Sequence, residues 1–106
     1  MDRHATDCTS LDEVRRQIDR IDADLVRLIA LRGTYVRRAA ALKRSPAEVP
    51  DPARVARVLD RVRALAVDAG AEPAVVEATW RAMVGAFIDA EQRLQARLQA
   101  QPAPGG

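Results

Sequence analysis

The feature that most constrains this chain is a long, uninterrupted helical pattern that begins near residue 10. Ser10 stands three residues before Glu13, which is the spacing of a capping box at a helix start. The first glycine after it is Gly33, and the first proline is Pro46. Apolar residues recur at helical spacing throughout this stretch, at Leu11, Val14, Ile18, Ile21, Leu25, Leu28, Val36, Ala39 and Leu42. The pattern predicts one helix over residues 11–43.

Two further helices are predicted after a connector over residues 44–50, which holds two prolines. Asp51 followed by Pro52 is typical of a helix start, with the aspartate as N-cap and the proline in the first turn. Gly70 predicts the end of this second helix, and Pro73 the start of a third.

Composition supports an all-α fold. Aromatic residues make up only 3% of the chain, and alanine, valine and leucine supply most of its 48% hydrophobic content. Such small aliphatic residues favour packed helices over a sheet. We therefore predict a three-helix domain over residues 10–99, a flexible leader over residues 1–9 and a disordered tail over residues 100–106.

The predicted first helix is too long for a compact monomer of this size. It would extend about 50 Å, whereas a domain of this length is roughly 30 Å across. Its apolar stripe would remain partly exposed, and such surfaces usually mark an interface. We therefore expect a homodimer. The alternative is a break near Gly33 that folds the chain into a four-helix monomer.

Several functional classes find little support. The net charge is +2, the two signs are interspersed, and few aromatic residues are present to stack on bases, so we expect no nucleic-acid partner. No apolar run is long enough for a membrane span, and the first ten residues do not resemble a signal peptide. The single cysteine, Cys8, favours a reducing compartment, and we expect a cytoplasmic protein.

Three cations and one acid occupy unusual positions in the helical pattern. On a helical wheel Arg32 lies within the apolar side of the first helix, Lys43 beside it and Arg15 at its margin. Glu91 lies in the apolar face of the third helix. An unpaired buried charge is costly, so these groups require partners. A small dicarboxylate ligand would satisfy them, and a structural ion pair is the alternative. Four other arginines point away and are interpreted as solvated, namely Arg16, Arg20, Arg27 and Arg38.

Spacing divides the cations between two chains. Arg32 and Lys43 are about 16 Å apart along a helix axis, close enough for two long side chains to hold one ligand. Arg15 is about 25 Å from Arg32. If Arg15 contributes, it must therefore come from the neighbouring chain.

These positions resemble a known family. The pattern of Leu11, Arg15, Ile18-Asp19, Ile21-Asp22, Arg32 and Lys43 is similar to that of the all-helical chorismate mutases. The resemblance implies an intertwined homodimer of three-helix chains that needs no cofactor or metal. It implies that Arg15 of one subunit completes the partner's site, and that Arg32 and Lys43 bind the substrate carboxylates, with Lys43 near the ether oxygen. Further substrate-binding positions implied are Val36, Val49, Arg54, Val58 and Ile88.

Two features depart from the typical mutase pattern. Val55 and Ala56 stand where mutases carry an Arg-Glu pair that handles the ring carboxylate and hydroxyl. Residues 49–55 and the Asp7-Cys8-Thr9 leader resemble instead the isochorismate-pyruvate lyase branch. Glu91 replaces the usual glutamine, as in some members that act on the 4-amino analogue of chorismate. Gln92 would take this position only if the helix held an extra residue.

A pericyclic reaction suits this chain because it requires a folded substrate and well-placed charge rather than a nucleophile or metal. The only histidine is His4. We predict a catalytic group of Arg32, Lys43 and Glu91, and chorismate mutase as the activity. Isochorismate-pyruvate lyase and 4-amino-4-deoxychorismate mutase are alternatives within the fold. A helical binding or regulatory module and a basic nucleic-acid binder are alternatives outside it.

Overall fold

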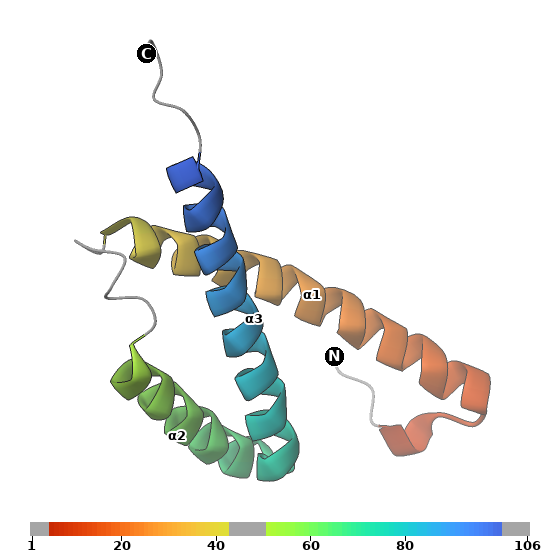
Figure 1. The fold of residues 1–106 in the computed structure, drawn as a ribbon. Coiled ribbons are helices and arrows are strands. Elements are labelled where there is room, and N and C mark those ends of the chain that lie inside the picture. Colours follow the sequence, from red (N-terminus) through yellow and green to blue (C-terminus); the bar gives the residue numbers. More distant parts are fainter. Residues whose placement is uncertain (1–4, 43–50, 101–106) are drawn as a thin grey trace. The chain divides into compact units, whose positions relative to one another are not determined.

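The computed structural model describes residues 5–42 and 51–100, which form three α-helices and one short 3-10 helix (Figure 1). The 3-10 helix spans Ala5–Asp7, α1 spans Leu11–Leu42, α2 spans Pro52–Ala69 and α3 spans Pro73–Ala100. These described ranges contain no strand, which confirms the all-α prediction. None of the helices that they form is long and apolar enough to cross a membrane.

The start of α1 is capped largely as predicted. The Glu13 N–H donates to Ser10 Oγ at 3.1 Å. The Glu13 carboxylate accepts from the N–H and the hydroxyl of Thr9, at 3.1 and 3.3 Å. In a standard capping box this return bond goes to the N-cap residue itself, so the predicted box is present with its second bond shifted by one residue.

Helix α1 continues through Gly33, which lies buried within it. The alternative prediction, in which the helix breaks at this glycine and the chain folds as a four-helix monomer, is therefore wrong. A single glycine costs a helix about 1 kcal/mol relative to alanine, too little to interrupt 32 otherwise helical residues.

The apolar side of α1 is largely exposed in the single chain. Ile18 is 50% exposed, Leu25 is 48% and Leu28 is 60%. The contacts divide the chain into two compact units, Met1–Tyr35 and Val36–Gly106. The first unit therefore carries an apolar surface that its own residues do not cover.

The second unit is built around the α2–α3 hairpin. The Asp51 carboxylate accepts from the backbone N–H groups of Ala53 and Arg54, at 3.1 and 3.3 Å, and starts α2 as predicted. Gly70 ends α2 in the left-handed region, with φ of 74°, and the Ala71 N–H donates to the Ala66 carbonyl at 2.8 Å. This tight end places the start of α3 a few residues later, so the two helices pack antiparallel.

The core of the hairpin is small. Its buried apolar side chains are Leu59, Val62 and Ala66, which share one face of α2. Leu65 belongs to the predicted apolar face but is 51% exposed. Only a narrow stripe of α2 packs against α3. Leu65 lies beside this stripe and therefore remains exposed to solvent.

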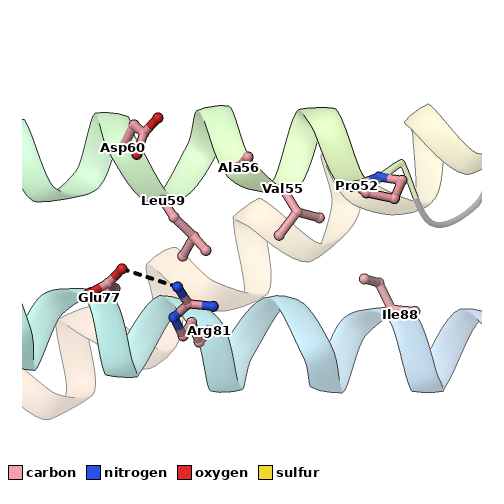
Figure 2. Close-up of a pocket in the computed structure, with 8 residues that line it drawn as sticks. All are labelled: Pro52, Val55, Ala56, Leu59, Asp60, Glu77, Arg81 and Ile88. Carbon is pink, nitrogen blue, oxygen red and sulfur yellow. Dashed lines mark hydrogen bonds and ion pairs between the residues drawn. The ribbon is translucent and has the colours of Figure 1, made fainter.

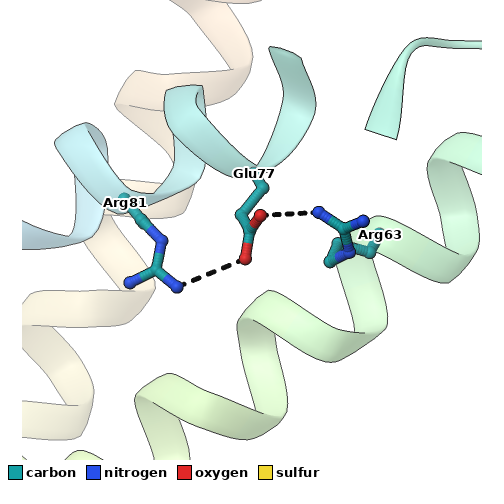
Figure 3. Close-up of polar contacts among 3 residues, drawn as sticks. All are labelled: Arg63, Glu77 and Arg81. Atoms are coloured by element: carbon teal, nitrogen blue, oxygen red, sulfur yellow. Dashed lines mark hydrogen bonds and ion pairs between the residues drawn. The ribbon is translucent and has the colours of Figure 1, made fainter. Parts of the chain in front are cut away.

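A shared carboxylate links the two helices near the turn (Figure 3). Glu77 of α3 accepts from Arg63 of α2 at 2.6 Å and from Arg81 of α3 at 3.2 Å. Glu77 is 26% exposed, and both arginines are more exposed. Pairs this open to water contribute about 1 kcal/mol or less each, and only the Arg63–Glu77 pair joins the two helices.

Candidate functional site

The α2–α3 hairpin carries a cleft of about 460 Å³. Eight residues line it: Pro52, Val55, Ala56, Leu59 and Asp60 from α2, and Glu77, Arg81 and Ile88 from α3 (Figure 2). The antiparallel packing determines which of them meet, because the first turns of α2 lie opposite the later turns of α3. A cleft of this size is large enough for part of a small organic acid.

The two ends of the cleft differ in character. Pro52, Val55 and Ile88 make one end apolar, whereas Asp60, Glu77 and Arg81 make the other end charged (Figure 2). The charged end is already internally paired, since Glu77 binds Arg81. The apolar end can therefore shield part of a ligand from water, but it provides no charge to bind one.

The first turns of α2 hold two predicted substrate-binding residues. Arg54 is exposed and Val58 is half-buried, and residues four apart share one face of a helix. The backbone of Arg54 is held by the Asp51 cap, which orders the turn that carries its guanidinium.

The later turns of α3 hold two more of the predicted residues. Ile88 and Glu91 are three apart and both half-buried, so they lie on one face of α3. Ile88 lines the cleft, whereas Glu91 lies one turn beyond it.

Helix α1 carries two of the predicted cations, Arg15 and Arg32. Arg15 is exposed and Arg32 is half-buried. They are 17 residues apart on one continuous helix, about 25 Å along its axis. Val36, one turn after Arg32, is half-buried. Lys43 and Val49 lie outside the described residues, so their predicted roles remain predictions.

Sequence reasoning missed the charged end of the cleft. The sequence predicts no role in a site for Leu59, Asp60, Glu77 or Arg81. The pairing of Glu77 with Arg81 has a local signal, because acid and base four residues apart on a helix attract. The bond from Arg63 to Glu77 joins positions 14 apart and follows only from the packing of the hairpin.

The described residues contain no group of three His, Cys, Asp or Glu side chains that could hold a metal ion. The side chains that line the cleft are mainly aliphatic or already paired. The arrangement can therefore bind and orient a small molecule and exclude water from one side of it. These are the demands of a reaction in which the substrate supplies all the bonds that change.

Comparison with known proteins identifies a family model and a relative that match most of the chain. The family model described as chorismate mutase type II matches residues 14–92. Isochorismate pyruvate lyase from Pseudomonas aeruginosa is 38% identical over 86 residues, which cover 81% of this chain and 84% of that protein. The matched region includes Arg15, Arg32 and Lys43, and it extends through the cleft to Glu91.

Proposed function

Because this chain belongs to the chorismate mutase type II family, we propose that it is a pericyclic enzyme that splits isochorismate into salicylate and pyruvate. The observation that carries this choice is the apolar wall formed by Val55 and Ala56 in the cleft. Typical mutases carry an Arg-Glu pair at these positions. A wall without charge gives the ring hydroxyl of chorismate no carboxylate partner, which favours a substrate with its hydroxyl elsewhere.

In the proposed reaction the ether bond between ring carbon and oxygen breaks while a ring hydrogen moves to the methylene carbon of the enolpyruvyl group. That group leaves as pyruvate, and the ring becomes aromatic as salicylate. No atom is gained or lost, and no external acid, base or oxidant is consumed. The protein contributes by holding the reactive conformer and by stabilising the charge that develops on the ether oxygen.

Each predicted residue receives a role in this reaction. Arg32 and Lys43 bind the two carboxylates, and Lys43 also faces the ether oxygen. The Glu91 side chain faces the same oxygen. Four aliphatic side chains pack against the ring, namely Val36, Val49, Val58 and Ile88. Arg54 adds positive charge at the entrance of the proposed site.

We further propose that the active form is a homodimer in which Arg15 reaches into the site of the other subunit. The exposed apolar side of α1 supports this assembly, because a surface of that kind is usually covered by a partner. The distance of about 25 Å between Arg15 and Arg32 supports it independently. Each dimer would then contain two shared sites.

The second candidate is a rearrangement of chorismate to prephenate, or of its 4-amino analogue to the corresponding product. Glu91 favours it, because members with glutamate at this position include enzymes for the amino analogue. Both candidates use the same proposed cations, and they differ in the substrate that is bound and in how its bound conformer reacts.

Incubation of the purified chain with each of three substrates tests the proposal: isochorismate, chorismate and 4-amino-4-deoxychorismate. We expect salicylate and pyruvate in equal amounts from isochorismate, and loss of this activity in Arg32→Ala. Prephenate from chorismate at a higher kcat/KM would establish the second candidate instead. Absence of turnover with all three substrates would leave a helical binding module and refute both.

A further inference from the structure

The second half of α1 contains basic residues but no acidic ones. From Leu25 to Leu42 the helix contains four arginines and no aspartate or glutamate. The first half, by contrast, alternates acids with bases. Two of the four arginines, Arg27 and Arg32, have an ion-pair partner or another interaction in the structure. The other two are Arg37 and Arg38.

Arg37 and Arg38 are exposed, and among the described residues neither makes an ion pair or a hydrogen bond through its side chain. Their neighbours three and four positions away are glycine, threonine, tyrosine, alanine and leucine. Arg27, in comparison, binds Asp24 three residues earlier. Intrahelical pairing, the common reason for an arginine on a solvated helix face, therefore does not explain Arg37 and Arg38.

The helix dipole does not explain them either. A cation stabilises the negative end of a helix, but the effect falls off beyond the last turn. The last described turn of α1 holds no basic residue, so Arg37 and Arg38 lie further inside. Both lie between Arg32 and Lys43 in the sequence, and about 7.5–9 Å beyond Arg32 along the helix.

We propose that Arg37 and Arg38 attract the dianionic substrate through the field of their charges, without touching it. This inference rests on the proposed function, because it assumes that the dicarboxylate binds near Arg32. A field of this kind acts almost equally on the bound substrate and on the transition state. It therefore lowers KM and leaves kcat unchanged, which distinguishes it from the contacts that Arg32 and Lys43 are proposed to make.

The expected size follows from Coulomb's law and screening. On a helical wheel Arg37 and Arg38 lie on other sides of α1 than Arg32, so their charges are roughly 15–20 Å from a dianion bound there. In water two such charges change its affinity by about twofold to threefold at 0.01 M salt, where the screening length is about 30 Å. At about 1 M salt the screening length is about 3 Å, and the change falls to nearly one. The salt dependence is thus part of the prediction.

The test compares the wild-type protein with Arg37→Gln/Arg38→Gln and with Arg37→Lys/Arg38→Lys. Glutamine removes the charges while keeping good helix propensity, and lysine retains the charges without the guanidinium geometry. Helical content and thermal midpoint are recorded for all three proteins. We expect the glutamine variant to raise KM about twofold to threefold at 0.01 M salt, with an unchanged kcat, and the lysine variant to match the wild type.

A KM that is equal in the glutamine variant and the wild type at 0.01 M salt would overturn the proposal. So would a loss of kcat in both variants, which would mean a direct contact or a structural role. If the wild type binds isochorismate or chorismate in calorimetry without turnover, the proposed function fails, and the same comparison is made on the dissociation constant. If it binds neither dicarboxylate, both proposals fail.

Discussion

Truncation of Leu25 to alanine tests whether the apolar side of α1 is the dimer interface. Leu25 is 48% exposed in the single chain and lies in the middle of the stripe. Complete burial of a leucine stabilises by about 1.5–3 kcal/mol relative to exposure. Covering the exposed half would therefore contribute about 1 kcal/mol per copy, or about 2 kcal/mol for the two copies in a symmetric dimer.

The expected consequence is a dissociation constant about 30-fold higher in Leu25→Ala than in the wild type. Sedimentation velocity over a dilution series measures it directly. Because Arg15 is proposed to serve the partner's site, specific activity should fall over the same concentration range as the dimer fraction. Agreement between the dimer fraction and the specific activity would indicate that the dimer is the active form.

Val67→Ala provides the matched control. Val67 is 67% exposed on α2, outside the α1 stripe, so its truncation should leave the dissociation constant unchanged. An unchanged constant in Leu25→Ala as well would show that the stripe is not the interface. A wild-type protein that is monomeric and fully active would refute the shared site altogether.

Three further predictions concern single residues. Ala56→Glu places a carboxylate in the cleft at the position of the mutase glutamate, so we expect less salicylate from isochorismate and more prephenate from chorismate, measured as a product ratio; an unchanged ratio would remove Ala56 as a specificity determinant. Glu91→Ala should lower kcat/KM for isochorismate by about tenfold or more, because it removes the polar group that is proposed to face the ether oxygen; an unchanged kcat/KM would contradict this role. Gly85 lies within α3, and a methyl group added to its Cα atom would meet no other group within 4 Å, so Gly85→Ala should raise stability by about 0.5–1 kcal/mol in thermal unfolding; a lower midpoint would mean that a partner packs closely there.

The helix boundaries were predictable because their causes are local. Asp51, Gly70 and Pro73 each act within about one helical turn, through a cap, a positive φ or a fixed φ, and the structure places all three as expected. The second bond of the Glu13 cap was not predicted, because it goes to Thr9 rather than to the N-cap residue Ser10. Local sequence determines the type of cap but not which of two adjacent donors it uses.

The cleft could not be predicted because it depends on the register between two helices. The sequence predicts Ile88 as a substrate-binding position but does not indicate that it lines the same space as Val55. That information comes from the short turn at Gly70 and from the bond between Arg63 and Glu77. A shift of one turn in either helix would change the lining residues while leaving every local pattern intact.

The proposed dimer makes stability and catalysis depend on the same surface. The apolar stripe and Arg15 belong to one helix, so the contacts that bury the stripe also determine where the partner's Arg15 is delivered. A site built in this way is incomplete in the monomer even if the α2–α3 hairpin is folded. Substitutions along α1 should therefore reduce activity through assembly, and substitutions in the cleft should change the reaction without affecting assembly. This separation gives each class of variant a distinct signature, because added protein concentration rescues the first class and not the second.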